Sequence, residues 1–145
     1  MGALPLSTYL HLTRASAAYD IVVMAPFATP WSFALLHAEL SALNQALGAA
    51  PLPPFAPLHL LLACLLGTLV LLWSVVRFTG PSLRLGRFDA SGRLLFSMWL
   101  GWALDGGSLP MLWLFLAPEL FWGVAQWWPV APADRGPVLR SAFSR

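Results

Sequence analysis

The sequence predicts an all-α integral membrane protein, a bundle of four transmembrane helices forming a single polytopic domain over residues 1–145. The first observation is composition: 59% of the residues are hydrophobic and only 10% are charged, whereas soluble domains carry about 25% charged residues. The second is a set of four apolar runs that predict spans over 17–36, 58–76, 90–105 and 109–129. The third is the distribution of arginine described below. The lipid bilayer is therefore the first expected partner.

The first expected span, 17–36, contains Pro26 and Pro30. Each proline removes a backbone donor and disfavours a straight helix. In lipid the freed carbonyls need protein neighbours, so we expect this helix to be proline-kinked and packed inside the bundle. Asp20 lies one turn inside its start. The leucine spacing of the following segment, 37–48, predicts a further helix at the membrane surface.

The second expected span, 58–76, has no charge and is closed by Arg77. In the third span the apolar run covers only residues 94–104. Eleven helical residues rise about 17 Å, which is less than the ~30 Å hydrocarbon core. The third helix must therefore begin earlier, with Asp89 as its expected N-cap and Arg93 drawn toward the hydrocarbon. The turn at Gly106–Gly107 joins the third and fourth helices in a tight hairpin.

The arginines predict the topology. With four spans, the N-terminus, the segment 77–93 with its loop 77–89, and the C-terminal tail 130–145 lie on one side of the membrane. All eight basic residues are arginines in these segments, and the two opposite loops have none. The positive-inside rule then places both termini in the cytoplasm. The few charges give no reason to expect a nucleic-acid partner.

Glu119 is the organising residue of the fourth span. It lies 12 residues after Gly107, about 18 Å deep at helical rise, and Arg93 lies 14 residues before Gly107, about 21 Å deep. Because ionisable groups inside a membrane tend to pair, we expect Glu119 to contact Arg93. The full candidate polar cluster of the membrane interior is Glu119, Arg93, Asp20, Ser97 and Gln126. Three interpretations remain open: a structural pair, a proton carrier or cation anchor, and a protonated acid.

Other candidate sites are weaker. The aromatic residues of the last two spans, Trp99, Trp102, Trp113 and Trp122, either line a pocket for an apolar ligand or pack the bundle. His37, Glu39, His59 and Asp105 come from three segments without the spacing of metal ligands, so we expect neither metal nor cofactor. The sequence has no glycine-rich phosphate loop, no GxSxG and no CxxC motif. An enzyme is therefore less expected than a protein without catalytic activity.

The stretch YDIVVMAPFATPW at 19–31 is similar to the opening of small uncharacterised four-span bacterial inner-membrane proteins, and the overall layout resembles theirs. This resemblance implies a location in the bacterial inner (plasma) membrane but no activity. The size, the cytoplasmic termini and the buried acids also resemble those of the sterol-isomerase-like EXPERA proteins. The acids of that group do not match this chain residue by residue.

Two functional hypotheses follow. The first is an accessory or interaction subunit, whose partner is another membrane protein or a second copy of the chain. The alternative is a binder, carrier or EXPERA-like enzyme for an apolar or cationic small molecule, centred on Glu119.

Overall fold

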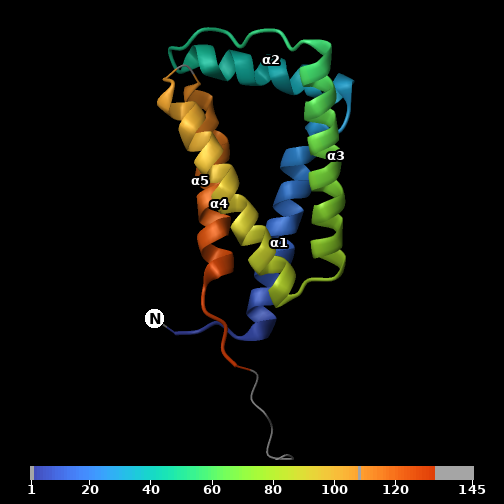
Figure 1. The fold of residues 1–145 in the computed structure, drawn as a ribbon, viewed down its shortest axis with the longest axis vertical. Coiled ribbons are helices and arrows are strands. Elements are labelled where there is room, and N and C mark those ends of the chain that lie inside the picture. Colours follow the sequence, from blue (N-terminus) through green and yellow to red (C-terminus); the bar gives the residue numbers. More distant parts are fainter. Residues whose placement is uncertain (1, 108, 133–145) are drawn as a thin grey trace, which may run out of the picture.

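The fold is all-helical and divides into two helix pairs (Figure 1). The computed structural model describes residues 2–107 and 109–132. Its elements in chain order are α1 (Leu6–Met24), the short 3-10 helix η1 (Ala25–Phe27), α2 (Pro30–Ala46), α3 (Pro57–Thr79), α4 (Leu83–Asp105), the short 3-10 helix η2 (Pro110–Leu112) and α5 (Trp113–Trp127). The helix α1 packs mainly against α3, and α4 packs mainly against α5. In Figure 1, α4 begins beside α1 and α3 and slants away from them toward the end that α2 crosses.

The segment expected as one kinked span, 17–36, is instead two helices. The helix α1 already begins at Leu6, and α2 is turned by 98° from the direction of α1 and η1. The chain turns because Pro30 disfavours helical backbone at the preceding residue. Thr29 is accordingly extended, with φ −134° and ψ 152°, and its hydroxyl accepts a hydrogen bond from the Ser32 amide at 3.2 Å. The prolines therefore break the helix rather than bend it.

The helix α2 and the loop after it cover the end of the molecule where the helix pairs are apart (Figure 1). Polar side chains of α2 hold this loop in place. The Asn44 amide donates to the Ala50 carbonyl at 2.8 Å, and the Ser41 hydroxyl accepts from the Leu52 amide at 3.0 Å. The predicted helix over 37–48 is thus part of α2.

The third expected helix starts earlier than the predicted boundary at residue 90. Ser82 caps α4, because its hydroxyl accepts from the Leu85 amide at 3.1 Å. The prediction that Asp89 is the N-cap is therefore wrong, and Asp89 lies in the second turn of α4. The expected loop 77–89 shrinks to the three residues between α3 and α4. The helix α4 has 23 residues and rises about 34 Å.

Two glycines set how closely the elements approach. A Cβ atom at Gly67 would lie 2.6 Å from the Phe27 Cβ atom, so α3 contacts η1 directly. A Cβ atom at Gly86 would lie 2.4 Å from the Tyr9 hydroxyl, so α4 contacts α1 directly. A side chain at position 67 would overlap the Phe27 backbone and force the elements apart, whereas a side chain at position 86 would displace the Tyr9 and Thr13 side chains.

Within the described residues, α3 is the one helix that is long and apolar enough to cross a membrane, with a mean hydropathy of 2.3. The bent pair of α1 with η1 and α2 adds a second candidate if it is counted as one broken span. The helix α4 carries three arginines and two aspartates, and α5 has only 15 residues. The structure thus supports the all-helical prediction, and the four-span membrane bundle stays a prediction.

Candidate functional site

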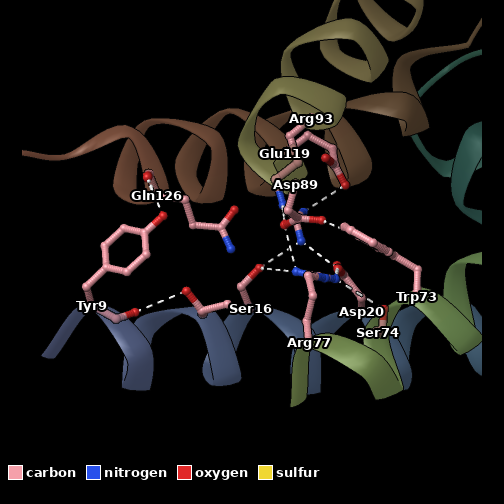
Figure 2. Close-up of polar contacts among 11 residues, drawn as sticks. Tyr9, Ser16, Asp20, Trp73, Ser74, Arg77, Asp89, Arg93, Glu119 and Gln126 are labelled. Carbon is pink, nitrogen blue, oxygen red and sulfur yellow. Dashed lines mark hydrogen bonds and ion pairs between the residues drawn. The ribbon is translucent and has the colours of Figure 1, made fainter. Parts of the chain in front are cut away.

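Five charged side chains meet where α4 leaves α1 and α3. Asp20 comes from α1, Arg77 from α3, Asp89 and Arg93 from α4, and Glu119 from α5; we call these five residues the ionic cluster (Figure 2). Each aspartate contacts both arginines. The Asp89 Oδ2 atom lies 2.7 Å from Arg77 Nη1 and 2.9 Å from Arg93 Nε. The Asp20 Oδ2 atom lies 2.6 Å from Arg93 Nη2 and also accepts from Arg77 Nη2. These four residues thus form a ring of alternating charge.

The ring is buried and supported by neutral donors and acceptors. The Arg77 side chain is fully buried, and that of Arg93 is 3% exposed. Ser16 on α1 accepts from Arg93 at 2.8 Å and from Arg77 at 3.3 Å. The Trp73 indole donates to Asp89 Oδ1 at 3.0 Å. Buried charges need this kind of compensation, because each has lost its water shell.

Glu119 is the least constrained member of the ionic cluster. It has one ion pair, to Arg93 at 3.1 Å, and its side chain is 19% exposed. Its Oε2 atom is buried and has no hydrogen-bond partner among the described residues. When all five groups are ionised, two positive and three negative charges leave the ionic cluster with a net charge of −1.

A cavity of about 990 Å³ borders the ionic cluster. The cluster contributes four lining residues, Asp20, Asp89, Arg93 and Glu119. Most of the remaining wall is aliphatic or aromatic and includes Val23, Phe27, Phe33, Val70, Phe96 and Phe115. The wall draws on all five α-helices and on the loop after α2. The cavity therefore combines an apolar interior with a charged region.

The pairing predicted from depth is present, because Arg93 donates to Glu119 and also reaches Asp20. The remaining two predicted members lie apart from these contacts. Ser97 is 8% exposed, and its hydroxyl has no partner in the part of the chain that the structure describes. Gln126 is fully buried on α5, on the Tyr9 side of the cluster (Figure 2).

Three of the four tryptophans predicted to line a pocket do not line the cavity. Trp99 lines the cavity. Trp102 and Trp113 do not line it: they are 74% and 59% exposed, so the prediction is wrong for both. Trp122 instead contacts Tyr19, with ring centroids 6.0 Å apart. The helical period alone does not say which face of α4 or α5 turns inward.

Arg77 and Asp89 belong to the site but were missed. Arg77 follows an apolar run, so its position also fits an arginine at a membrane boundary. Asp89 precedes an apolar run, so its position also fits a helix N-cap. One available signal was the four-residue spacing of Asp89 and Arg93, which places both on one helix face. A second was the polar series Tyr9, Thr13, Ser16 and Asp20, whose spacing follows one face of α1.

The described residues include no group of three or more His, Cys, Asp or Glu side chains that could hold a metal ion. The three acids of the ionic cluster are instead each paired with an arginine. The chemistry available at the site is therefore ion pairing, hydrogen bonding and proton exchange at a carboxylate.

Comparison with known proteins assigns no relative to the chain: no family model, no curated protein and no solved structure matches it.

Proposed function

We propose that the chain is an integral membrane protein that binds a small molecule with an apolar body and one cationic group. Its membrane location is supported by the distribution of polarity. The outward face of α3 is a row of leucines that are more than half exposed and do not line the cavity: Leu58, Leu61, Leu62, Leu65 and Leu72. The charged residues of the ionic cluster, by contrast, are inside. Exposed hydrocarbon around buried charge suits lipid as the surrounding solvent.

Arginine position supports the orientation. Arg84 and Arg87 lie in the first two turns of α4, at the end of the molecule where the chain begins (Figure 1). The positive-inside rule favours the cytoplasm for that end, as in an inner-membrane protein. The cavity and α2 would then lie toward the opposite side of the membrane.

The observation that carries the binding proposal is the Glu119 Oε2 atom. It is a buried carboxylate oxygen beside an apolar cavity, and no described residue donates to it. Cavities of 300–1,000 Å³ are the usual size for small-molecule sites, and a few convergent polar groups in an apolar wall fix the ligand's orientation. An apolar body would fill the cavity, and a cationic group would contact Glu119.

The net charge of the ionic cluster supports a cation rather than an anion. A ligand with one positive charge neutralises the charge of −1, whereas an anion would face three carboxylates. Buried ion pairs are often no more stabilising than well-packed apolar residues of similar volume. A role in recognition therefore accounts for the ionic cluster better than stability alone.

The test is equilibrium binding of the lipophilic cation methyltriphenylphosphonium to protein purified in mild detergent. Its neutral counterpart is triphenylphosphine oxide. We expect Glu119→Gln to weaken binding of the cation by about tenfold or more, because two opposite charges about 6 Å apart attract each other by about 2–3 kcal/mol at an effective dielectric constant of about 20. Binding of the neutral compound should be unchanged by the substitution.

Glu39→Gln is the matched control, because Glu39 is exposed on α2 and does not line the cavity. It should bind the cation like the wild-type protein. The proposal fails if the wild-type protein does not bind the cation, or if Glu119→Gln binds it as tightly as the wild-type protein.

A second candidate function is that of an accessory or interaction subunit. It is favoured by the exposed tryptophans of α4 and η2–α5, Trp99, Trp102 and Trp113, which are at least 59% exposed. Tryptophan is enriched at protein interfaces and also at membrane surfaces. Crosslinking in cells followed by purification separates the two: a subunit retains a specific protein or second copy, and Trp102→Ala weakens that association.

A further inference from the structure

A buried polar stripe runs along α1 from the ionic cluster toward the N-terminus. Tyr9, Thr13 and Ser16 are fully buried, and Asp20 is 7% exposed. Their spacing of four, three and four residues places them on one helix face. The eleven helical steps from Tyr9 to Asp20 correspond to about 17 Å of helix. This is a long polar surface to enclose in a bundle whose outer face is apolar.

Gln126 faces this stripe from α5. Figure 2 shows its side chain pointing from α5 toward α1, between Tyr9 and Ser16. The Tyr9 hydroxyl donates to the Gln126 main-chain carbonyl at 2.9 Å, so α1 and α5 are in direct contact here. The Gln126 side chain is fully buried, yet neither its Nε2 nor its Oε1 atom has a partner among the described residues. We call Tyr9, Thr13, Ser16 and Gln126 the polar column.

The polar column has unused hydrogen-bonding capacity at both of its ends. The Ser16 oxygen accepts from two guanidinium groups, so its own hydrogen must point to another acceptor. The Tyr9 hydroxyl donates one bond and can still accept. Buried amides and hydroxyls without protein partners are the groups that internal water molecules join. The unpartnered Gln126 amide is therefore the place in the polar column where internal water would bind first, between Tyr9 and the ionic cluster.

We propose that the polar column conducts protons between the arginine-rich end of the molecule and the ionic cluster, and that Glu119 is the residue that takes up and releases them. In one transfer, an acid in the solvent at the arginine-rich end gives up a proton. Each water of the chain accepts one proton and passes one on, while the side chains of the polar column hold the waters in place. The last proton forms an O–H bond on Glu119 Oε2, and the conjugate base stays in the solvent. Nothing is oxidised or reduced.

The surroundings of Glu119 are consistent with this role. Arg93 contacts it directly, while Arg77 from α3 lies behind the two aspartates. Asp20 and Tyr19 of α1 and Asp89 of α4 border the same cavity. One added proton brings the net charge of the ionic cluster from −1 to zero. Release toward the cavity restores the carboxylate, so protons cross the molecule from one end to the other.

The test is proton flux into vesicles of phosphatidylcholine and phosphatidylglycerol that contain the purified full chain and the internal pH dye pyranine. A potassium gradient with valinomycin supplies the driving voltage. We expect the wild-type protein to acidify the vesicles faster than empty vesicles. Glu119→Gln and Gln126→Met should each slow the protein-dependent flux by about tenfold or more, because the first removes the carboxylate that takes up the proton and the second removes the amide that holds the water chain.

Gln45→Met is the matched control, because Gln45 is an exposed glutamine of α2 whose amide donates to the Ser41 carbonyl at 3.2 Å. It should keep the wild-type flux. If Gln126→Met does not fold, Tyr9→Phe replaces it, because this change removes only the hydroxyl and should also slow the flux. Wild-type flux equal to that of empty vesicles, or a folded polar-column variant with wild-type flux, overturns the proposal.

This inference shares Glu119 with the proposed function, and binding of methyltriphenylphosphonium to the same preparations separates the two. Cation binding that depends on Glu119, without proton flux, overturns the polar column alone. Proton flux that depends on Gln126, without cation binding, overturns the binding function alone. Gln126→Met should bind the cation like the wild-type protein, because Gln126 does not line the cavity.

Discussion

Arg77 is the charged residue whose loss the fold should tolerate least. It is fully buried, pairs with Asp20 and Asp89, and donates to Ser16 and Ser74. Arg77→Met keeps a long unbranched side chain but removes the guanidinium, so Arg93 becomes the one arginine paired with both aspartates. The net charge of the ionic cluster falls from −1 to −2. Removing one partner of a buried pair costs about 3–5 kcal/mol, which is a large part of a total stability of about 5–15 kcal/mol.

Glu119→Gln should change the free energy of unfolding much less than Arg77→Met. It raises the net charge of the ionic cluster to zero, and the amide oxygen can still accept from Arg93. We therefore expect a change in the free energy of unfolding of within about 1 kcal/mol. The surface control is Arg84→Met, which loses an exposed guanidinium that lies 5.7 Å from the Phe88 ring centroid. It should also cost no more than about 1 kcal/mol.

These differences are measured by titrating the protein with SDS in mixed micelles and following helix content by circular dichroism. Adding Asp20→Asn to Arg77→Met restores the charge of −1 and should recover part of the loss. If Arg77→Met costs no more than Arg84→Met, the ring of alternating charge does not hold the helices together.

Two further predictions concern packing and the cavity. Gly67→Ala should lower the free energy of unfolding by about 1–3 kcal/mol, because the new methyl group overlaps Phe27. Gly101→Ala, where no atom lies within 4 Å, should be neutral or slightly stabilising in the same SDS titration, and equal effects at both sites would refute the close contact. Val70→Trp fills part of the cavity and should weaken binding of methyltriphenylphosphonium at least about tenfold. Leu72 does not line the cavity, so Leu72→Trp should leave binding of the cation unchanged. If Val70→Trp binds the cation as tightly as the wild-type protein, the cation binds outside the cavity.

Helix content and one central contact could be predicted from the sequence. The apolar stretches identify α3, α5 and most of α4, and counting helical rise from Gly107 places Arg93 and Glu119 at similar depth. That count succeeds because α4 and α5 are joined by a short turn and pack against each other. A local argument of this kind holds only between neighbours in the chain.

The remainder of the site depends on long-range packing. Arg77 and Asp20 are 57 residues apart, and no local pattern says that α1 and α3 bring them together. The prolines at 26 and 30 are compatible with a kink or with a break, and the extended conformation of Thr29 decides for the break. Similarly, helical periodicity assigns Trp102 to a face of α4 and Trp113 to a face of α5. Whether those faces are exposed depends on how each helix is rotated about its own axis in the bundle.

The position of a bound cation shows whether Glu119 receives the cationic group of a ligand in the apolar cavity. Crystals grown with methyltriphenylarsonium, in which arsenic replaces phosphorus, locate the arsenic atom by its anomalous scattering. We expect one peak inside the cavity, next to the Glu119 carboxylate, which disappears in Glu119→Gln. A peak only on the exposed leucine face of α3, or a cavity peak that is unchanged in Glu119→Gln, would contradict this expectation.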